Sequence, residues 1–470
     1  MSNNYPPEDH ESPSNDEFAP RALWSSTELE VDHFLHDEIQ SMKGEIEDQL
    51  DDKLSKDTVV IVGSGTAGLI LSRKLDEEKF NIILISPDET SPHTSLLASA
   101  ACGLVDFYLA EEQIRHKSRK LTYYKARVED VDFIRKVCRC RSACDVHGGK
   151  DRLFEVKYDR LVLAPGYAIH TFDIPGADEH ALFLRTVADA RRIHHHLIQL
   201  LELASIPHVS ADEQRRLLHV VVVGGGPTSV DLAGKLSDAI DTDFATLYPE
   251  LKDKVSISIH DSRAYHSGRF EAALRQYCLE SSSRRHVQLF VDSHITNVEV
   301  DSITTDTLGR VPCGMVIWTA GSKTCALVDK LKTVKSEGEP PRILTEEYLH
   351  VLSPDPEQKA MSHVYALGDA ADIKDGSLPP TAEVARQKAE YLADTLNAES
   401  DKKKVFEYQQ QQGLLGWLGG NDGVVQGQTD WTPSRAWAAW QSGNSNSPFA
   451  RSWRHDLSIA MHWLADWVIG

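Results

Sequence analysis

Two glycine-rich turns carry the most recognisable chemistry in this sequence of 470 residues. They are Gly63-Ser64-Gly65-Thr66-Ala67-Gly68 and Gly224-Gly225-Gly226-Pro227-Thr228-Ser229, and each follows a run of β-branched residues and precedes a helical pattern. In such a turn one glycine permits the tight bend, another lets the backbone approach a pyrophosphate, and the following helix N-terminus attracts negative charge. Two such turns predict a chain that holds two dinucleotides. Electron transfer from a nicotinamide to a flavin is the usual reason for that pairing.

Strand and helix patterns supply the elements that must position the first turn. The sequence predicts a strand, turn and helix over Thr58–Asp76 and a second strand over Asn81–Ile85. Residues 120–158 resemble a short antiparallel meander, and Arg160–Gly166 is typical of a buried strand that ends in a turn. These elements together predict the beginning of one dinucleotide-binding domain.

A second unit of the same kind begins at about Leu218, with later strands predicted at Val255–Ile259 and Gly314–Ala320. Asp241–Lys252 is a short insertion between helix and strand, and Val364–Asp369 returns to a buried strand with an acid at its end. This order predicts an α/β fold with two Rossmann-like dinucleotide-binding domains, one inserted in the other, followed by a C-terminal helical region.

Composition excludes several classes of partner. The chain has 71 acidic and 50 basic residues, so its formal net charge is −21, which argues against nucleic-acid binding and against long-range attraction to an anionic membrane. Its seven cysteines do not form a disulfide framework, which predicts a reducing compartment. Cys138, Cys140 and Cys144 form the one cluster, which lacks a fourth ligand. We therefore predict a surface hairpin there and no metal.

The two ends of the chain differ from its body. Residues 1–57 are rich in acids and resemble neither a signal peptide nor a mitochondrial presequence; the first 20 are expected to be disordered, and Leu29–Leu54 is expected to form a surface helix. Seven of the nine tryptophans follow residue 400, and residues between Trp453 and Trp467 share one helical face. That helix would lie in a membrane interface or dock onto the body of the protein or a second subunit, and both alternatives stay open. No apolar run is long enough to cross a bilayer.

From about Thr58 onward the sequence resembles the two-dinucleotide-binding flavoproteins, and within them the type II NADH dehydrogenases. The most specific mark is Leu378–Gln387, which is similar to the helix that in this family flanks the flavin and faces the quinone. The other marks are Ile85-Ser86-Pro87, Thr94-Ser95-Leu96-Leu97, Ala164-Pro165-Gly166, Phe172-Asp173-Ile174-Pro175-Gly176, Tyr248-Pro249-Glu250-Leu251, Ile317-Trp318-Thr319-Ala320-Gly321 and Leu367-Gly368-Asp369. The resemblance implies FAD and NADH as cofactors and a quinone as acceptor.

The resemblance also assigns residues to the FAD. The pyrophosphate is expected at Gly63, Gly65 and Gly68, and Asp369 stands at a strand end where its carboxylate can accept a ribityl hydroxyl. Thr94 matches the position of a polar group near the flavin. The end of the second strand carries Ser86, with Asp88 two residues on, where an acid usually contacts the adenosine ribose. The remaining residues expected around the FAD are Ala67, Gly166, Gly368 and Ala382.

In the second unit Gly224 and Gly226 match the motif, whereas Ser229 replaces the third glycine. Asp261 ends the second strand of that unit, where a carboxylate can bind both ribose hydroxyls and repel a 2′-phosphate. NADH is therefore expected in preference to NADPH, although the neighbouring Arg263 could accommodate a phosphate. Gly321 completes the residues expected near the nicotinamide cofactor.

Three residues are expected to act on the acceptor side. Asp231 stands where the family has a glutamate close to the flavin, and Gln387 matches a glutamine of the quinone-facing helix. Glu383 departs from the family, which has glutamine there. A buried Glu383 with a raised pKa could donate a proton or change the acceptor; the alternative is a solvated helix on which Glu383 pairs with Arg386. No cysteine lies between Gly68 and Cys102, which excludes a disulfide reductase.

The predicted boundaries are an acidic, partly disordered extension at 1–57, an FAD-binding domain at 58–190 and 329–398, an NAD(P)H-binding domain at 191–328, and a tryptophan-rich amphipathic region at 399–470. The leading hypothesis is an FAD-dependent oxidoreductase that passes two electrons from NADH to a quinone or quinone-like acceptor. The alternatives are a soluble tailoring oxidoreductase that acts on a metabolite and an NAD(H)-sensing flavoprotein of apoptosis-inducing-factor type. The protein is expected to be intracellular, in the cytoplasm or at a membrane surface, and a homodimer stays open.

Overall fold

The computed structural model describes residues 56–115, 120–146, 151–262, 287–398 and 404–409, together with the backbone of 415–417, 422–426 and 431–435. The chain divides into two compact units, Met1–Lys56 and Asp57–Gly470, and all that follows concerns the second. The helix predicted over Leu29–Leu54, the helical face from Trp453 to Trp467, and Arg263 lie outside the described residues. In the described ranges no helix has both the length and the apolar character that crossing a membrane requires.

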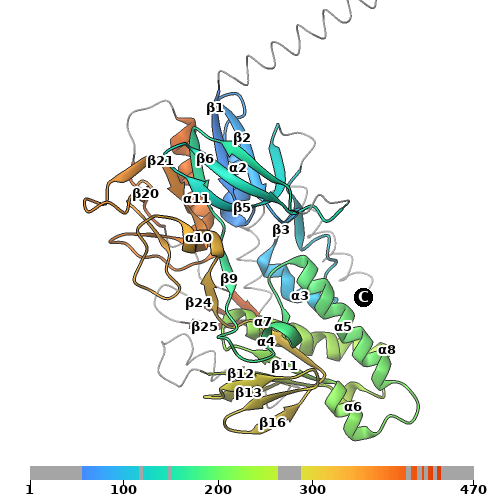
Figure 1. The fold of residues 1–470 in the computed structure, drawn as a ribbon. Helices are drawn as coiled ribbons and strands as arrows, with labels where there is room; N and C mark the ends of the chain where they lie inside the picture. The colour runs from blue at the N-terminus through green and yellow to red at the C-terminus, as the bar shows by residue number, and fades with distance from the viewer. Residues whose placement is uncertain are drawn as a thin grey trace, which may run out of the picture. The chain divides into compact units, whose positions relative to one another are not determined.

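A ten-stranded sheet joins two distant parts of the sequence. The late strand β21 (Ala360–Ala366) pairs in parallel with β8 (Arg160–Leu163), which pairs with β1 (Asp57–Val62), so blue and orange strands belong to one sheet in Figure 1. This pairing confirms the prediction of a domain that is interrupted and then resumed. The full strand order is β22 (Ala371–Ile373), β19 (Ile343–Thr345), β20 (His350–Leu352), β21, β8, β1, β2 (Phe80–Ser86), β5 (Thr122–Asp132), β6 (Val137–Ser142) and β7 (Leu153–Lys157).

Two helices cover one face of this sheet. The helices α2 (Thr66–Lys74) and α11 (Ala382–Asn397) pack against each other and against β-branched residues of β1. Leu69 and Leu71 of α2 and Leu392 of α11 are fully buried in that core, because the apolar positions of each helix recur on one side. The helix α11, from late in the sequence, is thereby held beside α2, the helix that follows the first glycine turn.

The strands β5, β6 and β7 form the predicted meander, whose cysteines are part of the core. Cys138 and Cys140 are 0% and 1% exposed on β6, so the prediction of a hairpin is confirmed and its placement at the surface was wrong. The strand alternates between two faces, and both sulfur atoms pack with apolar side chains of the second face of the sheet. Burial raises the pKa of the Cys140 thiol to about 12, which makes it unreactive.

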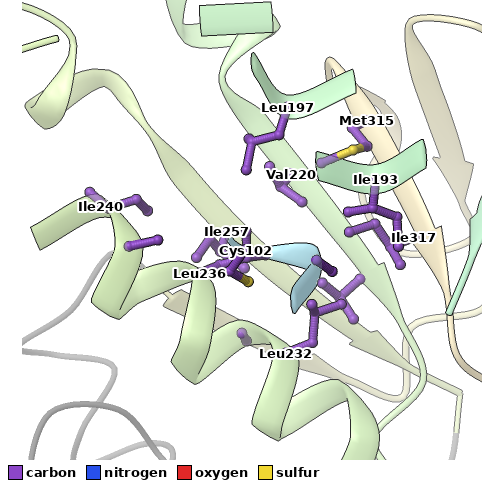
Figure 2. Close-up of a cluster of buried hydrophobic side chains, with 14 of the residues drawn as sticks. Cys102, Ile193, Leu197, Val220, Leu232, Leu236, Ile240, Ile257, Met315 and Ile317 are labelled. Carbon is purple, nitrogen blue, oxygen red and sulfur yellow. The ribbon is translucent and has the colours of Figure 1, made fainter. Parts of the chain in front are cut away.

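A five-stranded parallel sheet forms the inserted part. Its order is β10 (Leu182–Phe183), β17 (Met315–Trp318), β11 (His219–Val223), β12 (Ser256–Asp261) and β13 (Val287–Val291). The helices α3 (Leu97–Ala101), α5 (Val187–Ala204) and α7 (Pro227–Ala239) share one hydrophobic core with this sheet. In Figure 2 Leu232 and Leu236 of α7 lie beside Cys102, with Val220, Ile257 and Ile317 of the sheet around them.

Shorter elements complete the second sheet. An antiparallel group, β14 (Ile295–Val298), β15 (Ser302–Thr305) and β16 (Gly309–Pro312), contributes apolar residues to the core on its other face. The predicted insertion at Asp241–Lys252 begins as a helix: a π-helical turn (Ile240–Phe244) and α8 (Ala245–Leu247) continue α7. The described part of the C-terminal region forms a small sheet of β23 (Leu415–Trp417), β24 (Asp422–Gln426) and β25 (Trp431–Arg435), and β23 contacts α7.

Candidate functional site

The first glycine turn leaves an open space in front of the N-terminus of α2. Gly63 has φ +101°, and a Cβ atom there would lie 2.2 Å from the carbonyl oxygen of Ala164, so glycine is required between the ends of β1 and β8. A Cβ on Gly68 would lie 1.9 Å from the oxygen of Gly63, so this helix packs directly on the turn. Gly65, the N-cap, has no neighbour within 4 Å of the position of its missing Cβ, and no side chain caps the helix. The helix end is therefore able to receive a pyrophosphate.

The late part of the chain brings an acid to this turn. Gly368 and Asp369 form a short 3₁₀ turn, η4 (Gly368–Ala370), directly after β21. A Cβ on Gly368 would lie 3.5 Å from the Cβ of Ala67, so η4 contacts the first turn of α2. Burial raises the pKa of Asp369, while Arg185 and Arg342 oppose that shift. The two predicted halves of the FAD site therefore meet at one edge of the sheet.

Arg185 is a residue that sequence reasoning missed. It stands just before Thr186, the N-cap of α5, and its Nη2 atom lies 3.2 Å from where a Cβ of Gly166 would be. Its charge acts on the carboxyl groups of Asp88 and Asp369, and the residue is exposed. A guanidinium in this position faces the ends of several strands and suits a phosphate. No motif in the sequence marks Arg185 among the several arginines between residues 164 and 218.

The residues at the end of β2 divide their roles. Ser86 is 2% exposed, and its hydroxyl accepts a hydrogen bond from Ser64 at 2.8 Å. Ser86 therefore stabilises the glycine turn itself. The Asp88 side chain is exposed, although partial desolvation raises the pKa of its carboxyl while Arg127 and Arg185 counter that effect. Asp88 is thus better placed than Ser86 to contact a ribose.

Two further residues expected at the FAD are each the first residue of a helix. Ala382 is the first residue of α11, whose N-cap Thr381 accepts a hydrogen bond from the Val384 N–H. Thr94 opens the 3₁₀ turn η1 (Thr94–Leu96), is exposed, and has no hydrogen-bond partner among the described residues. The role assigned to Thr94 therefore stays a prediction.

The second turn repeats the geometry of the first. Gly224 has φ +116°, and a Cβ there would lie 3.1 Å from Ala320, which precedes Gly321. Gly226 is the N-cap of α7, and no atom lies within 4 Å of the position of its missing Cβ. Ser229 preserves the packing of helix on strand, since its Oγ lies 2.6 Å from the Thr319 hydroxyl, which donates to the oxygen of Val223. The replacement of the third glycine is therefore accommodated.

Asp261 lies directly against this second turn. The residue ends β12 and is 6% exposed, and a Cβ on Gly225 would lie 2.0 Å from its Oδ2 atom. The preceding His260 is fully buried, stacks on Phe290 and hydrogen bonds with Ser293 at 2.9 Å. The Ser293 N–H in turn donates to the backbone oxygen of Asp261. The strand end that presents the carboxylate is therefore held by buried hydrogen bonds.

Asp231 belongs to a group of charges along α7. Burial raises the pKa of Asp231 to about 6, Lys235 opposes that shift, and Asp238 adds to it. Residues 231, 235 and 238 share one face of the helix, and Lys235 is only 8% exposed. The same charges act on the Cys102 thiol in the adjoining core. Asp231 is thus a carboxyl whose protonation changes near neutral pH.

Glu383 and Gln387 are brought together on α11. The guanidinium of Arg386 donates to both carboxylate oxygens of Glu383, at 3.1 and 2.7 Å, and the Gln387 amide donates to one of them at 2.6 Å. Burial raises the pKa of Glu383, but these hydrogen bonds outweigh it, and the pKa lies below its usual value. A proton donor with a raised pKa is therefore contradicted, whereas the alternative pairing with Arg386 is present on a largely buried surface. Neither residue hydrogen bonds with Asp231 among the described side chains.

Comparison with protein families gives a match over most of the chain. A family model described as pyridine nucleotide-disulphide oxidoreductase matches residues 57–389. The fold is similar to a solved structure of NDH2 from Plasmodium falciparum in complex with NADH, with a TM-score of 0.77 and 21% identity. That similarity covers 87% of this chain and 98% of the other.

Curated relatives are closer in sequence. The chain is 34% identical over 325 residues to the mitochondrial external alternative NAD(P)H-ubiquinone oxidoreductase B2 of Arabidopsis thaliana, which covers 68% of this chain and 55% of that protein. It is 33% identical over 353 residues to the mitochondrial internal alternative NAD(P)H-ubiquinone oxidoreductase A1 of Solanum tuberosum. That alignment covers 73% of this chain and 69% of the relative. The chain thus spans little more than half the length of the first relative.

Proposed function

Because the chain belongs to the type II NADH:quinone oxidoreductase family of pyridine nucleotide-disulphide oxidoreductases, we propose that it transfers two electrons from NADH to a quinone or quinone-like acceptor. The observation that carries this proposal is the pair of open helix N-termini at Gly65 and Gly226, each of which follows a strand that pairs in parallel with both its neighbours. A bound FAD supplies the redox chemistry that links a hydride donor to an electron acceptor. The residues of the chain bind and orient the three molecules.

FAD fits the first turn by the chemistry of the groups around it. The N-terminus of α2 would hold the pyrophosphate, Asp369 would accept a ribityl hydroxyl, and Asp88 would contact the adenosine ribose. Arg185 would neutralise the pyrophosphate, since its guanidinium reaches the same strand ends from the start of α5. This assignment replaces Ser86 by Asp88 and adds a cation that the sequence did not indicate.

NADH in preference to NADPH rests on Asp261. Its carboxylate lies against Gly225, at the place where the ribose next to the second turn would be bound. A carboxylate there can accept both ribose hydroxyls, and it repels a 2′-phosphate. The α7 N-terminus at Gly226 would hold the pyrophosphate of the same cofactor.

The acceptor site is proposed on α11. Glu383 as an anion and Gln387 as an amide would form its polar wall, and Ala382 would place the helix N-terminus towards the flavin. Asp231 would adjust the charge on the flavin from α7, because its protonation changes near pH 6. The homodimer and the contact of the C-terminal helix with a membrane were left open by the sequence, and both stay open.

The decisive experiment measures reduction of the flavin by NADH and its reoxidation by a quinone as two separate half-reactions. Purified protein should be yellow and should release FAD into the supernatant on acid precipitation. Anaerobic NADH should bleach the flavin absorbance, and a soluble quinone should restore it. A colourless protein that cannot be reconstituted with FAD contradicts the proposal. Reduction by NADH without reoxidation by any quinone in a broad panel supports a tailoring or sensing protein instead.

A further inference from the structure

We propose that Asp372, paired with Arg342, is a positioning residue that fixes the start of α11 relative to Asp369. The inference rests on the proposed function, because it concerns how the acceptor side of the site is held against the flavin side. Neither residue belongs to a motif in the sequence. Their importance is visible only in the hydrogen bonds that converge on them.

The side chain of Asp372 joins the two ends of a short loop, residues 373–378. Its Oδ1 atom accepts hydrogen bonds from the N–H groups of Ile373 and Leu378, at 2.9 and 3.1 Å. Its Oδ2 atom accepts from the Ser377 hydroxyl at 2.6 Å and from the Arg342 guanidinium. The carboxylate side chain is 4% exposed, so these four donors replace water. A single carboxylate thus holds both ends of the segment from Ile373 to Leu378.

Arg342 fastens the same loop from the neighbouring strand. Its Nη1 atom donates to the carbonyl oxygen of Leu378 at 2.8 Å, and its Nη2 atom donates to the Ser377 hydroxyl at 3.0 Å. Arg342 directly precedes β19, which pairs in parallel with β22, so that Leu344 stands opposite Asp372. The pair is therefore built into the edge of the ten-stranded sheet.

The position of Leu378 determines where α11 begins. Only Pro379 and Pro380 separate Leu378 from the N-cap Thr381, and the rings of both prolines fix their φ angles. On the other side, Asp369 lies three residues before Asp372 and is joined to it through η4 and β22. Asp372 thus sets the spacing between the flavin-facing acid and the acceptor-facing helix.

Lys388 of α11 interacts through its charge with both Asp372 and Arg342. It lies within the helix, is 1% exposed, and its charge faces Asp372 and Arg342. Burial lowers the pKa of Lys388 to about 8, and the attraction of Asp372 opposes that shift. Without the negative charge of Asp372, the buried cation Lys388 and the partly buried cation Arg342 would face each other beneath the helix.

The test compares Asp372→Asn with Ser377→Ala in the flavin-loaded protein. Asparagine keeps the shape and can still accept from Ile373 and Leu378, but it loses the ion pair. We expect about a tenfold rise in KM for a soluble quinone, because charge-assisted hydrogen bonds are lost. Ser377→Ala removes one hydroxyl only and should change KM less. Flavin reduction by NADH should remain near the wild-type rate in both.

Hydrogen–deuterium exchange gives a readout that does not depend on turnover, and a double variant tests the balance of charge. Hydrogen–deuterium exchange should rise across residues 373–384 in Asp372→Asn and stay unchanged there in Asp130→Asn, which alters an exposed ion pair with Arg139. Replacing Lys388 by methionine in the Asp372→Asn background should partly restore KM, because it removes one of the two facing cations. If Asp372→Asn does not fold, Arg342→Lys carries the same test, since lysine keeps the charge but cannot reach all three partners.

An unchanged quinone KM together with unchanged exchange at 373–384 in folded Asp372→Asn overturns the inference. An equal loss of NADH reduction and quinone reduction overturns it as well, because a general structural role predicts that result. Failure of the proposed function is a different outcome: the wild-type protein would then not be reoxidised by any quinone, whereas the exchange readout would still report on the loop.

Discussion

Gln387 and Gln409 are joined by two reciprocal hydrogen bonds between the side chain of one and the backbone of the other. The Gln387 Nε2 atom donates to the carbonyl oxygen of Gln409 at 2.8 Å, and the Gln409 N–H donates to the Gln387 Oε1 atom at 3.0 Å. The segment 404–409 is also held by the Tyr391 hydroxyl, which donates to the oxygen of Lys404. A residue assigned to the acceptor thus also anchors the chain that leads into the C-terminal region.

Gln387→Ala should release this segment and impair the acceptor step together. The two hydrogen bonds to this segment are lost, which is expected to cost about 1–3 kcal/mol of local stability, and the hydrogen bond to Glu383 is lost as well. Hydrogen–deuterium exchange at residues 404–409 and the rate of reoxidation by a quinone measure the two effects. Gln409→Ala is a matched control, because it removes a side chain but keeps the backbone groups that Gln387 binds. Equal behaviour of the two variants would contradict the pairing.

Glu383→Gln should change the choice of acceptor and leave reduction by NADH nearly intact. The substitution removes an anion that Arg386 and Gln387 hold in place, so the charge next to a bound quinone becomes more positive. Reoxidation rates across a panel of quinones and pH values test this. Glu390→Gln is the control, since Glu390 binds the same arginine from farther along α11. Identical rates, pH profile and acceptor preference in wild type and Glu383→Gln would exclude this helix from the acceptor site.

Asp261→Ala should reduce the discrimination between NADH and NADPH, mainly by weakening NADH. The loss of hydrogen bonds to a carboxylate predicts about 1–3 kcal/mol. Anaerobic stopped-flow measurement of flavin reduction with each cofactor gives the ratio. Asp253→Ala, at an exposed acid before the opposite end of the same strand, should not change it. Equal or faster reduction of the wild type by NADPH would refute the assignment of Asp261.

Asp231 should govern a pH dependence centred near its pKa of about 6. The carboxyl is protonated below that pH and ionised above it, so a step that needs the protonated form slows from about pH 5 to about pH 7. Asp231→Asn should flatten this profile. Asp238→Asn should move the midpoint to lower pH, because Asp238 raises the pKa of Asp231. A midpoint that Asp238→Asn leaves in place would show that another group titrates.

The protein should lose stability as the pH falls from about 6.5 towards 4, partly because of His260. Burial lowers the pKa of His260 to about 4, so in this window the unfolded chain binds a proton that the folded chain does not. The loss is at most about 3 kcal/mol for this residue. Thermal unfolding across the window measures it, and His260→Asn should reduce the slope. His195→Asn, at an exposed position of α5, should not.

The amino-acid sequence by itself determined the framework of this protein. Glycine turns framed by β-branched runs and helical patterns predicted both sheets and their nested order, and placed Gly65, Gly226, Asp261 and Asp369 at the ends of strands and the starts of helices. Such signals are local, because a strand, a tight turn and a helix start each leave their mark on neighbouring residues. The meander was predicted in the same way, although the burial of Cys138 was not, since burial depends on what packs against a strand.

Only the tertiary structure decided which side chains meet. The charge of Arg185 acts on Asp369, Arg342 binds Asp372, and Gln387 binds Gln409. Each pair comes from elements that are far apart in sequence or unmarked by any motif. The protonation of Glu383 was decided in the same way, because burial and the hydrogen bonds of Arg386 act on its pKa in opposite directions and only the folded geometry sets their balance. Local patterns fix where the chain turns, whereas charge and hydrogen bonding depend on distances that exist only after folding.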